Sequence, residues 1–218
     1  MQWTTRPLFA ATLLGLGLCT TAATAQAEGF ALGAKLGTTG LGLEGTVGLR
    51  DHLNLRGGVY GLDYSRELEE DGIEYDGDLE LRSAALLADW HPFGGGFRVS
   101  AGGYYNGNEF SGSAEGSLDI GNNTYDARLD ATVDWDGFAP YLGVGYGNAV
   151  AGGGWSFAFD LGVMFTGSPS VDLDGQVNNA ALQDQFEDDL RREEAQLEDD
   201  VEDIEYYPVL NLGLAYRF

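Results

Sequence analysis

The feature that most restricts the fold of this chain is an alternation of apolar with small or polar residues that recurs along most of its length. At the C-terminus, Leu210, Leu212 and Leu214 alternate with Asn211 and Gly213. Successive side chains of a β-strand point to opposite faces of its sheet, so a period of two indicates a strand. Comparable segments predict eight strands, at about 30–36, 41–49, 53–64, 79–90, 97–110, 138–147, 155–165 and 208–218.

The two faces of these strands differ in kind. One face carries Leu, Val, Phe and Trp, and the other is rich in the 34 glycines of the chain. A soluble β-sandwich also alternates, but it should expose charge rather than large apolar side chains on every strand. The pattern therefore predicts an all-β fold, an eight-stranded antiparallel up-and-down transmembrane β-barrel with its larger apolar face against lipid. The segment 79–90 fits least well, because its apolar parity changes near 83–85, which predicts a bulge.

The connections between the predicted strands are of two kinds. Segments 50–52, 92–96 and 148–154 are short, whereas 65–78, 111–136 and 166–207 are long and acidic. Short periplasmic turns that alternate with long extracellular loops are typical of outer-membrane barrels. The short connection 38–40 is an exception on the outer side.

The N-terminal segment has the features of a signal peptide. Arg6 precedes the apolar stretch 8–18, and the small residues of 23–27 form two overlapping A-x-A sites. We expect a signal peptide over 1–27 and the barrel over 28–218. A lipoprotein anchor at Cys19 is an alternative, although Leu18 stands where a small residue is expected.

The last strand, 210–218, resembles the C-terminal strand of outer-membrane proteins, which ends in a phenylalanine. The chain 28–218 resembles the small eight-stranded OmpA/OmpX-like barrels, without a peptidoglycan-binding domain. The resemblance implies a monomer in the outer membrane of a Gram-negative cell, with lipid, lipopolysaccharide and the barrel assembly machinery as partners. It also implies that an assembly signal is formed by Leu214, Tyr216 and Phe218.

Several charged residues have the parity of the predicted lumen. They are Lys35, Glu44, Arg56, Arg98 and Asp160. If Thr39-Gly40 forms a two-residue turn, Lys35 lies opposite Glu44, and Arg56 comes within reach of Glu44. The charges either neutralise one another and plug the barrel or line a gated pore. Eight strands leave room for little more than side chains, which favours the plug.

The third long connection is strongly acidic. From Asp184 to Glu205 it contains twelve acidic residues and two arginines, and apolar residues recur there at helical spacing. We expect a helix over about 179–204 in the last extracellular loop, packed across the barrel mouth. Its acidic residues would form a lid that attracts cations or binds Ca²⁺ or Mg²⁺ loosely. The lid residues are Asp184, Glu187, Asp188, Glu194, Glu198 and Asp199.

The remaining chemistry of the sequence is sparse. A formal charge of −24 argues against a nucleic-acid partner. Both histidines, His52 and His91, fall in predicted periplasmic turns, and the sequence contains no Ser–His arrangement, H-E-x-x-H motif or EF-hand pattern. We therefore expect no enzyme, no catalytic or metal site and no cofactor. The expected function is a non-enzymatic outer-membrane protein with a structural or surface-interaction role. The alternative is a small porin for cationic solutes such as basic amino acids.

Overall fold

The structure is a computed structural model that describes residues 29–70, 73–135 and 137–218. The predicted signal peptide, 1–27, lies outside the described residues. Among the described residues, no helix combines the length and the apolar character needed to span a membrane.

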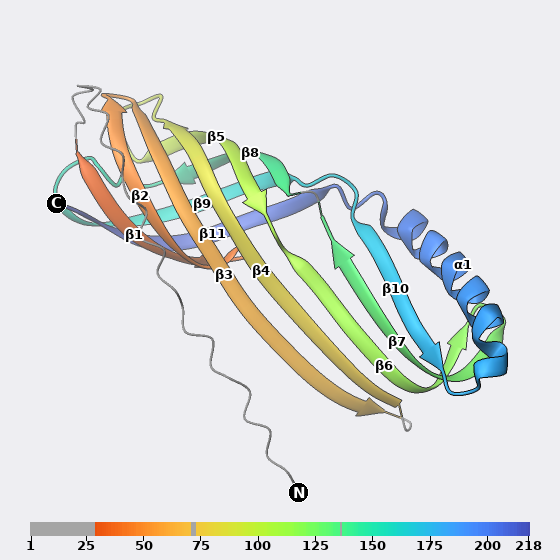
Figure 1. Cartoon of the computed structure of the whole chain (residues 1–218). Helices are drawn as coiled ribbons and strands as arrows, with labels where there is room; N and C mark the ends of the chain where they lie inside the picture. The colour runs from red at the N-terminus through yellow and green to blue at the C-terminus, as the bar shows by residue number, and fades with distance from the viewer. Residues whose placement is uncertain (1–28, 71–72, 136) are drawn as a thin grey trace, which may run out of the picture.

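Eight antiparallel strands form a closed ring (Figure 1). Strand β1 pairs with β11 through partners such as Leu36 and Leu212, so the prediction that the first and last strands close the sheet is confirmed. In ring order the strands are β1 (Phe30–Gly37), β2 (Gly40–Arg50), β3 (Leu53–Glu70), β4 (Ile73–Trp90), β5 (Phe97–Asn106), β8 (Phe138–Tyr146), β9 (Gly154–Phe165) and β11 (Tyr206–Arg217). We call this part the ring.

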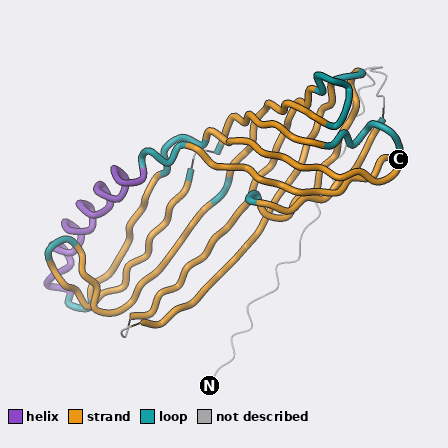
Figure 2. Tube along the Cα trace, turned by 180° about the vertical axis from the view of Figure 1, so that it is seen from behind, coloured by secondary structure: helices purple, strands orange, loops and turns teal. Residues whose placement is uncertain are grey.

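A second sheet continues from the long strands β3 and β4. Strand β4 pairs with β5 from Ser83 to Trp90, but its other half pairs with β6 from Glu74 to Glu80. Strands β6 (Glu109–Ile120), β7 (Asn123–Asp134) and β10 (Ser170–Val177) complete an open sheet in the order β3-β4-β6-β7-β10. We call this sheet, together with helix α1, the extension; Figure 2 shows it projecting from one end of the ring.

The extension corrects the expectation of long loops. Segments 65–78 and 111–136 are mainly strand, and 166–207 contains β10 as well as helix. These strands also alternate, but acidic and hydroxyl side chains occupy one face where the ring strands carry apolar ones. They therefore lack the apolar outer face by which the ring strands were predicted.

The predicted bulge near 83–85 is also wrong. The β3–β4 register runs without a shift from Leu53 opposite Trp90 to Glu70 opposite Ile73. The apparent change of parity arises because Leu81 and Leu87, which are apolar, point into the protein rather than away from it.

The helix of the last connection is α1 (Gln183–Val201), preceded by a short 3₁₀ turn at Ala180–Leu182. Phe186 and Leu190 are buried against β6, β7 and β10, and Leu197 and Val201 pack at the edge of the same cluster. The helix therefore covers the extension sheet (Figure 1). The prediction that it packs across the mouth of the barrel is wrong. The apolar stripe of α1 is buried against the apolar residues Leu118, Tyr125 and Leu173 of the sheet.

Candidate functional site

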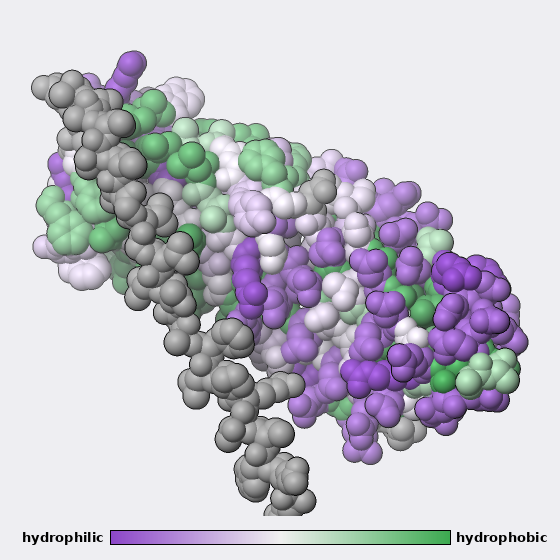
Figure 3. All heavy atoms as spheres, viewed as in Figure 1, coloured by the Kyte–Doolittle hydropathy of each residue, from purple (hydrophilic) through white to green (hydrophobic). Residues whose placement is uncertain are grey.

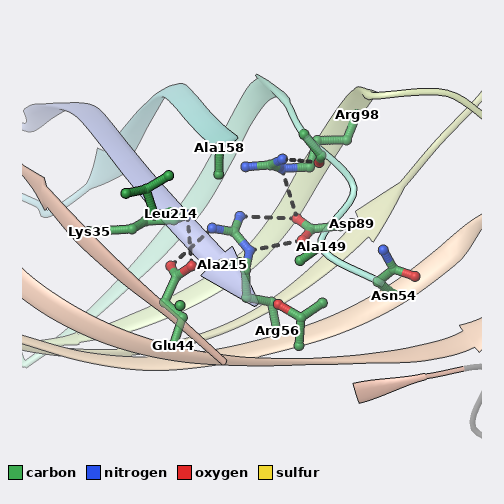
Figure 4. A pocket seen from close by; sticks show the side chains of 13 residues that line it. Lys35, Glu44, Asn54, Arg56, Asp89, Arg98, Ala149, Ala158, Leu214 and Ala215 are labelled. Atoms are coloured by element: carbon green, nitrogen blue, oxygen red, sulfur yellow. Dashed lines mark hydrogen bonds and ion pairs between the residues drawn. The ribbon is translucent and has the colours of Figure 1, made fainter. Parts of the chain in front are cut away.

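The interior of the ring contains a compact network of six charged side chains, and Figure 4 draws all of them except Asp160. Three are basic and three are acidic, and each is at most 6% exposed. They come from six different strands, so only closure of the ring brings them together. The members are Lys35, Glu44, Arg56, Asp89, Arg98 and Asp160.

Arg56 is the hub of this network. Its guanidinium donates to both carboxylate oxygens of Asp89, at 2.8 and 3.1 Å, and to Glu44 at 3.0 Å. It also donates to Asp160 at 3.2 Å. Arginine can satisfy several carboxylates at once because its five N–H donors are fixed in a plane.

The other two cations complete the charge balance. The Lys35 ammonium lies 2.8 Å from Glu44 and also contacts Asp160. Arg98 donates to Asp160 at 2.5 Å. Because a buried charge without a partner costs several kcal/mol, this matched set can be held in the ring where an unequal set could not.

The structure brings together all five charged residues that the sequence placed in the lumen. It adds Asp89, which was missed because the parity of β4 was misassigned. Asp89 also accepts a hydrogen bond from Ser100 at 2.5 Å. The alternation of β3 with β4 would have revealed it: Asp89 lies opposite Asn54, which is also buried.

The predicted register of the first hairpin is wrong by two residues. Gly37 pairs with Gly40 around a turn at Thr38-Thr39, so Lys35 lies opposite Gly42 and not Glu44. Strand β11 holds this turn, because Thr38 donates to the carbonyl of Pro208 and Thr39 to the side chain of Asn211. A shift of two residues preserves the parity, and Lys35 still reaches Glu44 diagonally.

An aromatic layer closes the ring on the side of the extension. The ring of Tyr104 packs between those of Tyr60 and Tyr141, with centroid distances of 5.8 Å to Tyr60 and 5.4 Å to Tyr141. Leu87, Met164 and Val209 are buried among them. The Tyr60 hydroxyl donates to Glu44 and so joins this layer to the charged one.

The glycine-rich face of the ring provides space for these side chains. A side chain at Gly42 would overlap the ring of Tyr60, and one at Gly162 would overlap the ring of Tyr141. The interior is consequently filled rather than open. The cavity that remains beside the charge network has a volume of about 20 Å³, room for one or two water molecules.

Polar side chains fill the other end of the ring, where strand β1 begins and strand β11 ends. His91 is buried there, and its Nδ1 atom lies 2.9 Å from the carbonyl oxygen of Gly95. The Asn54 side-chain amide nitrogen lies 3.1 Å from the Nε2 atom of His91 and donates to the side-chain oxygen of Asn148, also at 3.1 Å. His52 lies beside the same turn, 2.7 Å from the carbonyl of His91.

The acidic residues expected to form a lid do not converge on one point. Asp184, Glu187, Asp188, Glu198 and Asp199 are exposed on α1, and Asp188 pairs with Arg191 on the same helix. Glu194 accepts the backbone N–H of Leu173 at 3.1 Å and so fixes the helix to β10. Within the described ranges, no three His, Cys, Asp or Glu side chains are grouped to hold a metal ion.

A buried carboxylate, which the sequence did not single out, anchors α1. Asp189 accepts hydrogen bonds from the Tyr125 hydroxyl at 2.6 Å and the Asn123 amide at 2.7 Å. It also pairs with Arg192 at 2.7 Å. These contacts, with the Tyr125 hydrogen bond the largest, lower the pKa of Asp189 because they favour its ionised form.

The lowered pKa of Asp189 predicts an acid-sensitive attachment of α1. A carboxylate with a depressed folded pKa stabilises the fold above its unfolded pKa of about 3.9, and this contribution is lost as the pH falls through the folded value. The hydrogen-exchange protection of segment 183–201, measured relative to the intrinsic exchange rate at each pH, should therefore fall below about pH 4. In Asp189→Asn this loss of protection should be smaller, and an identical pH dependence of protection in both proteins would contradict the role of Asp189.

The residues expected to form the assembly signal lie on the outward face of β11 and directly after its end. Leu214, Tyr216 and Phe218 are partly exposed, and the Tyr216 ring packs edge-on against Trp155 and Phe218. Phe218 also stacks with Phe30, so aromatic rings of the first and last strands meet at the closure of the ring.

Comparison with known proteins gives a likeness in structure only. No protein-family model matches the chain, and no curated protein matches it. Crystal structures of CarO2 and CarO from Acinetobacter baumannii have TM-scores of 0.60 and 0.59 and sequence identities of 23% and 22%. Both alignments cover 87% of this chain, and they cover 98% and 97% of the respective neighbour. A major outer membrane protein from Thermus thermophilus is 18% identical, with a TM-score of 0.43.

CarO and CarO2 are outer-membrane β-barrel proteins, and at these identities the likeness concerns the fold. It supports the outer-membrane location expected from the sequence. The chain has the fold of an outer-membrane β-barrel protein.

Proposed function

We propose that this protein is an integral outer-membrane β-barrel with a closed lumen, which presents its acidic extension at the cell surface in a structural or surface-interaction role. The observation that carries this proposal is the filled interior of the ring. A balanced ion network and a layer of three tyrosines occupy it and leave a cavity of only about 20 Å³. In this proposal the protein is one of the small OmpA/OmpX-like barrels, and its eight-stranded ring supports that relationship.

The outer surface of the ring supports insertion in a bilayer. Each ring strand exposes large apolar side chains, among them Leu36, Leu43, Val59, Leu86, Tyr105, Leu142, Phe157 and Leu212. Figure 3 shows hydrophobic residues gathered over the ring and hydrophilic ones over the extension. A soluble monomer rarely exposes a continuous apolar surface of this size. With hydrocarbon around the ring, its backbone groups remain paired because the sheet closes on itself.

Aromatic side chains at both ends of the ring define the two interfaces. At the end of the ring where β1 begins and β11 ends, the exposed aromatic residues are Trp90, Tyr146 and Trp155. At the end near the extension they are Tyr105 and Phe138. Rings of this kind favour the boundary between hydrocarbon and water. The extension then lies outside the bilayer, and we place it on the extracellular side because outer-membrane barrels carry their larger connections there.

The proposed role is non-enzymatic, and the partners are those expected for such a barrel. They comprise membrane lipid, lipopolysaccharide and the barrel assembly machinery, which would read the strand that ends in Tyr216 and Phe218. The protein is proposed to act as a monomer. Divalent cations at the acidic surface would reduce its repulsion from anionic lipopolysaccharide.

Conductance separates the closed barrel from the alternative, a small porin for cationic solutes. The refolded protein in planar bilayers should give no stable channel steps, because both interior layers are filled. The double variant Glu44→Ala/Tyr104→Ala should produce steps, since it removes one group from each layer. The matched control Glu44→Ala/Tyr105→Ala should not, because Tyr105 points outward and is 69% exposed whereas Tyr104 is 1% exposed. Reproducible cation-selective steps in the unmodified protein would establish the porin instead.

A further inference from the structure

The extension is an amphipathic sheet with two unlike faces. On one face, Glu67, Asp76 and Asp130 alternate with the residues of the other face along β3, β4 and β7, and they are exposed. The opposite face is apolar and carries Tyr64, Leu68, Tyr75, Leu79, Phe110, Ala114, Leu129 and Ala131. A sheet of this kind normally buries its apolar face under a second layer.

Helix α1 supplies only part of that layer. It buries the face near Leu118, Tyr125 and Leu173, on the side of β10. Over β3, β4 and β6 the face remains uncovered, with Tyr64 56%, Leu68 54% and Phe110 48% exposed. The result is an open groove of about 470 Å³, a volume in the range of small-molecule sites.

The charge around the groove restricts what can occupy it. Segments 63–82, 109–136 and 166–205 contain 30 acidic and five basic residues. A second copy of the chain docked through this face would bring two strongly negative extensions together, and an anion would meet the same repulsion. Both are therefore disfavoured as occupants, whereas a cation is attracted.

The walls of the groove fit the body of such a cation. Tyr64, Tyr75 and Phe110 offer aromatic faces, which attract a positive charge when it is partly desolvated. Asp76 borders the groove only through its position on β4, because its side chain lies on the acidic face with that of Glu67. The negative charge that attracts a cation is therefore that of the surrounding acidic surface. Arg66 opposes a cation, but it also borders a polar recess that contains Glu67, Asp76 and Asp78.

We propose that this groove is a binding site for hydrophobic organic cations, molecules with an apolar body of a few hundred cubic ångströms and one positive charge. This site goes beyond the proposed structural role, and it does not depend on whether the lumen conducts.

Tetraphenylphosphonium and tetraphenylborate provide a direct test, since they have nearly the same size and shape and opposite charge. Equilibrium dialysis would compare their binding to the full mature protein in zwitterionic lipid nanodiscs with binding to empty nanodiscs. Tetraphenylphosphonium should bind saturably above the nanodisc background, at least tenfold more tightly than tetraphenylborate. Equal binding, stronger binding of the anion, or no binding above background would overturn the proposal.

Substitutions then locate the site. Phe110→Ser and Tyr64→Ser lie on different strands of the groove, and each should weaken tetraphenylphosphonium binding by about tenfold, since each removes a large apolar contact. Arg66→Gln should strengthen binding because it removes the opposing charge. Ser111→Ala, on the other face of β6, is the matched control and should leave the affinity unchanged.

Heat-modifiable migration on gels would verify that each variant still forms the ring. Folded Phe110→Ser and Tyr64→Ser proteins that bind with unchanged affinity would place the cation elsewhere on the acidic surface and overturn the groove as its site. A concentration-dependent dimer that disappears in Phe110→Ser would identify a second copy as the occupant and would also overturn it.

Discussion

Replacing Arg56 with methionine is expected to destabilise the ring by about 3–5 kcal/mol, the usual cost of removing one partner from a buried ion network. Methionine fills much of the same space but supplies no donor. Glu44, Asp89 and Asp160 would then share only Lys35 and Arg98, so one negative charge would remain without compensation. The urea midpoint of the protein refolded in lipid vesicles measures this loss.

A surface arginine provides the control for this experiment. Arg82 also contacts two acids, Asp63 at 3.6 Å and Glu80 at 3.0 Å, but its side chain is 62% exposed. Exposed ion pairs contribute about 1 kcal/mol or less, so Arg82→Met should barely shift the midpoint. Equal shifts in the two variants would mean that the interior network does not hold the ring together.

Phe186→Ala is expected to detach α1 from the extension while the ring stays intact. Phe186 is fully buried and packs edge-on against Tyr125, with ring centroids 5.2 Å apart. Truncation of a buried phenylalanine typically costs about 3–5 kcal/mol. The contacts of α1 within the described residues are with the extension strands and the adjoining 3₁₀ turn, so this loss should appear as local opening.

Limited proteolysis reports this opening. Cleavage within 183–201 should accelerate strongly in Phe186→Ala, and the protein should still migrate as a folded barrel before boiling. Leu182→Ala removes an apolar side chain that is 37% exposed, and it should have little effect. Simultaneous loss of the barrel in Phe186→Ala would show that the ring and the extension unfold as one cooperative unit.

The sequence alone determined the properties that depend on local alternation. Within the eight ring strands, a period of two separates the outward-facing Leu and Phe from the inward-facing Gly, Lys and Arg, because neighbouring side chains must point to opposite faces. This parity placed Lys35, Glu44 and Arg56 on the same face of the sheet. The hairpin register was wrong by two residues, but a shift of two leaves every side chain on its predicted face. The apolar repeat of 182–204 likewise predicted a helix, because its spacing is a property of one segment.

Only the tertiary structure decided how these segments combine. Strand β4 is one continuous strand, yet half of it pairs with β5 and half with β6. Nothing local to β4 specifies that division, because backbone hydrogen-bond donors and acceptors are the same along the strand. The position of α1 was decided in the same way: its apolar stripe could not indicate which surface would bury it until β6, β7 and β10 had formed a sheet. Asp89 became part of the network only when pairing of β4 with its neighbours brought it within reach of Arg56 and Ser100, which lie on other strands.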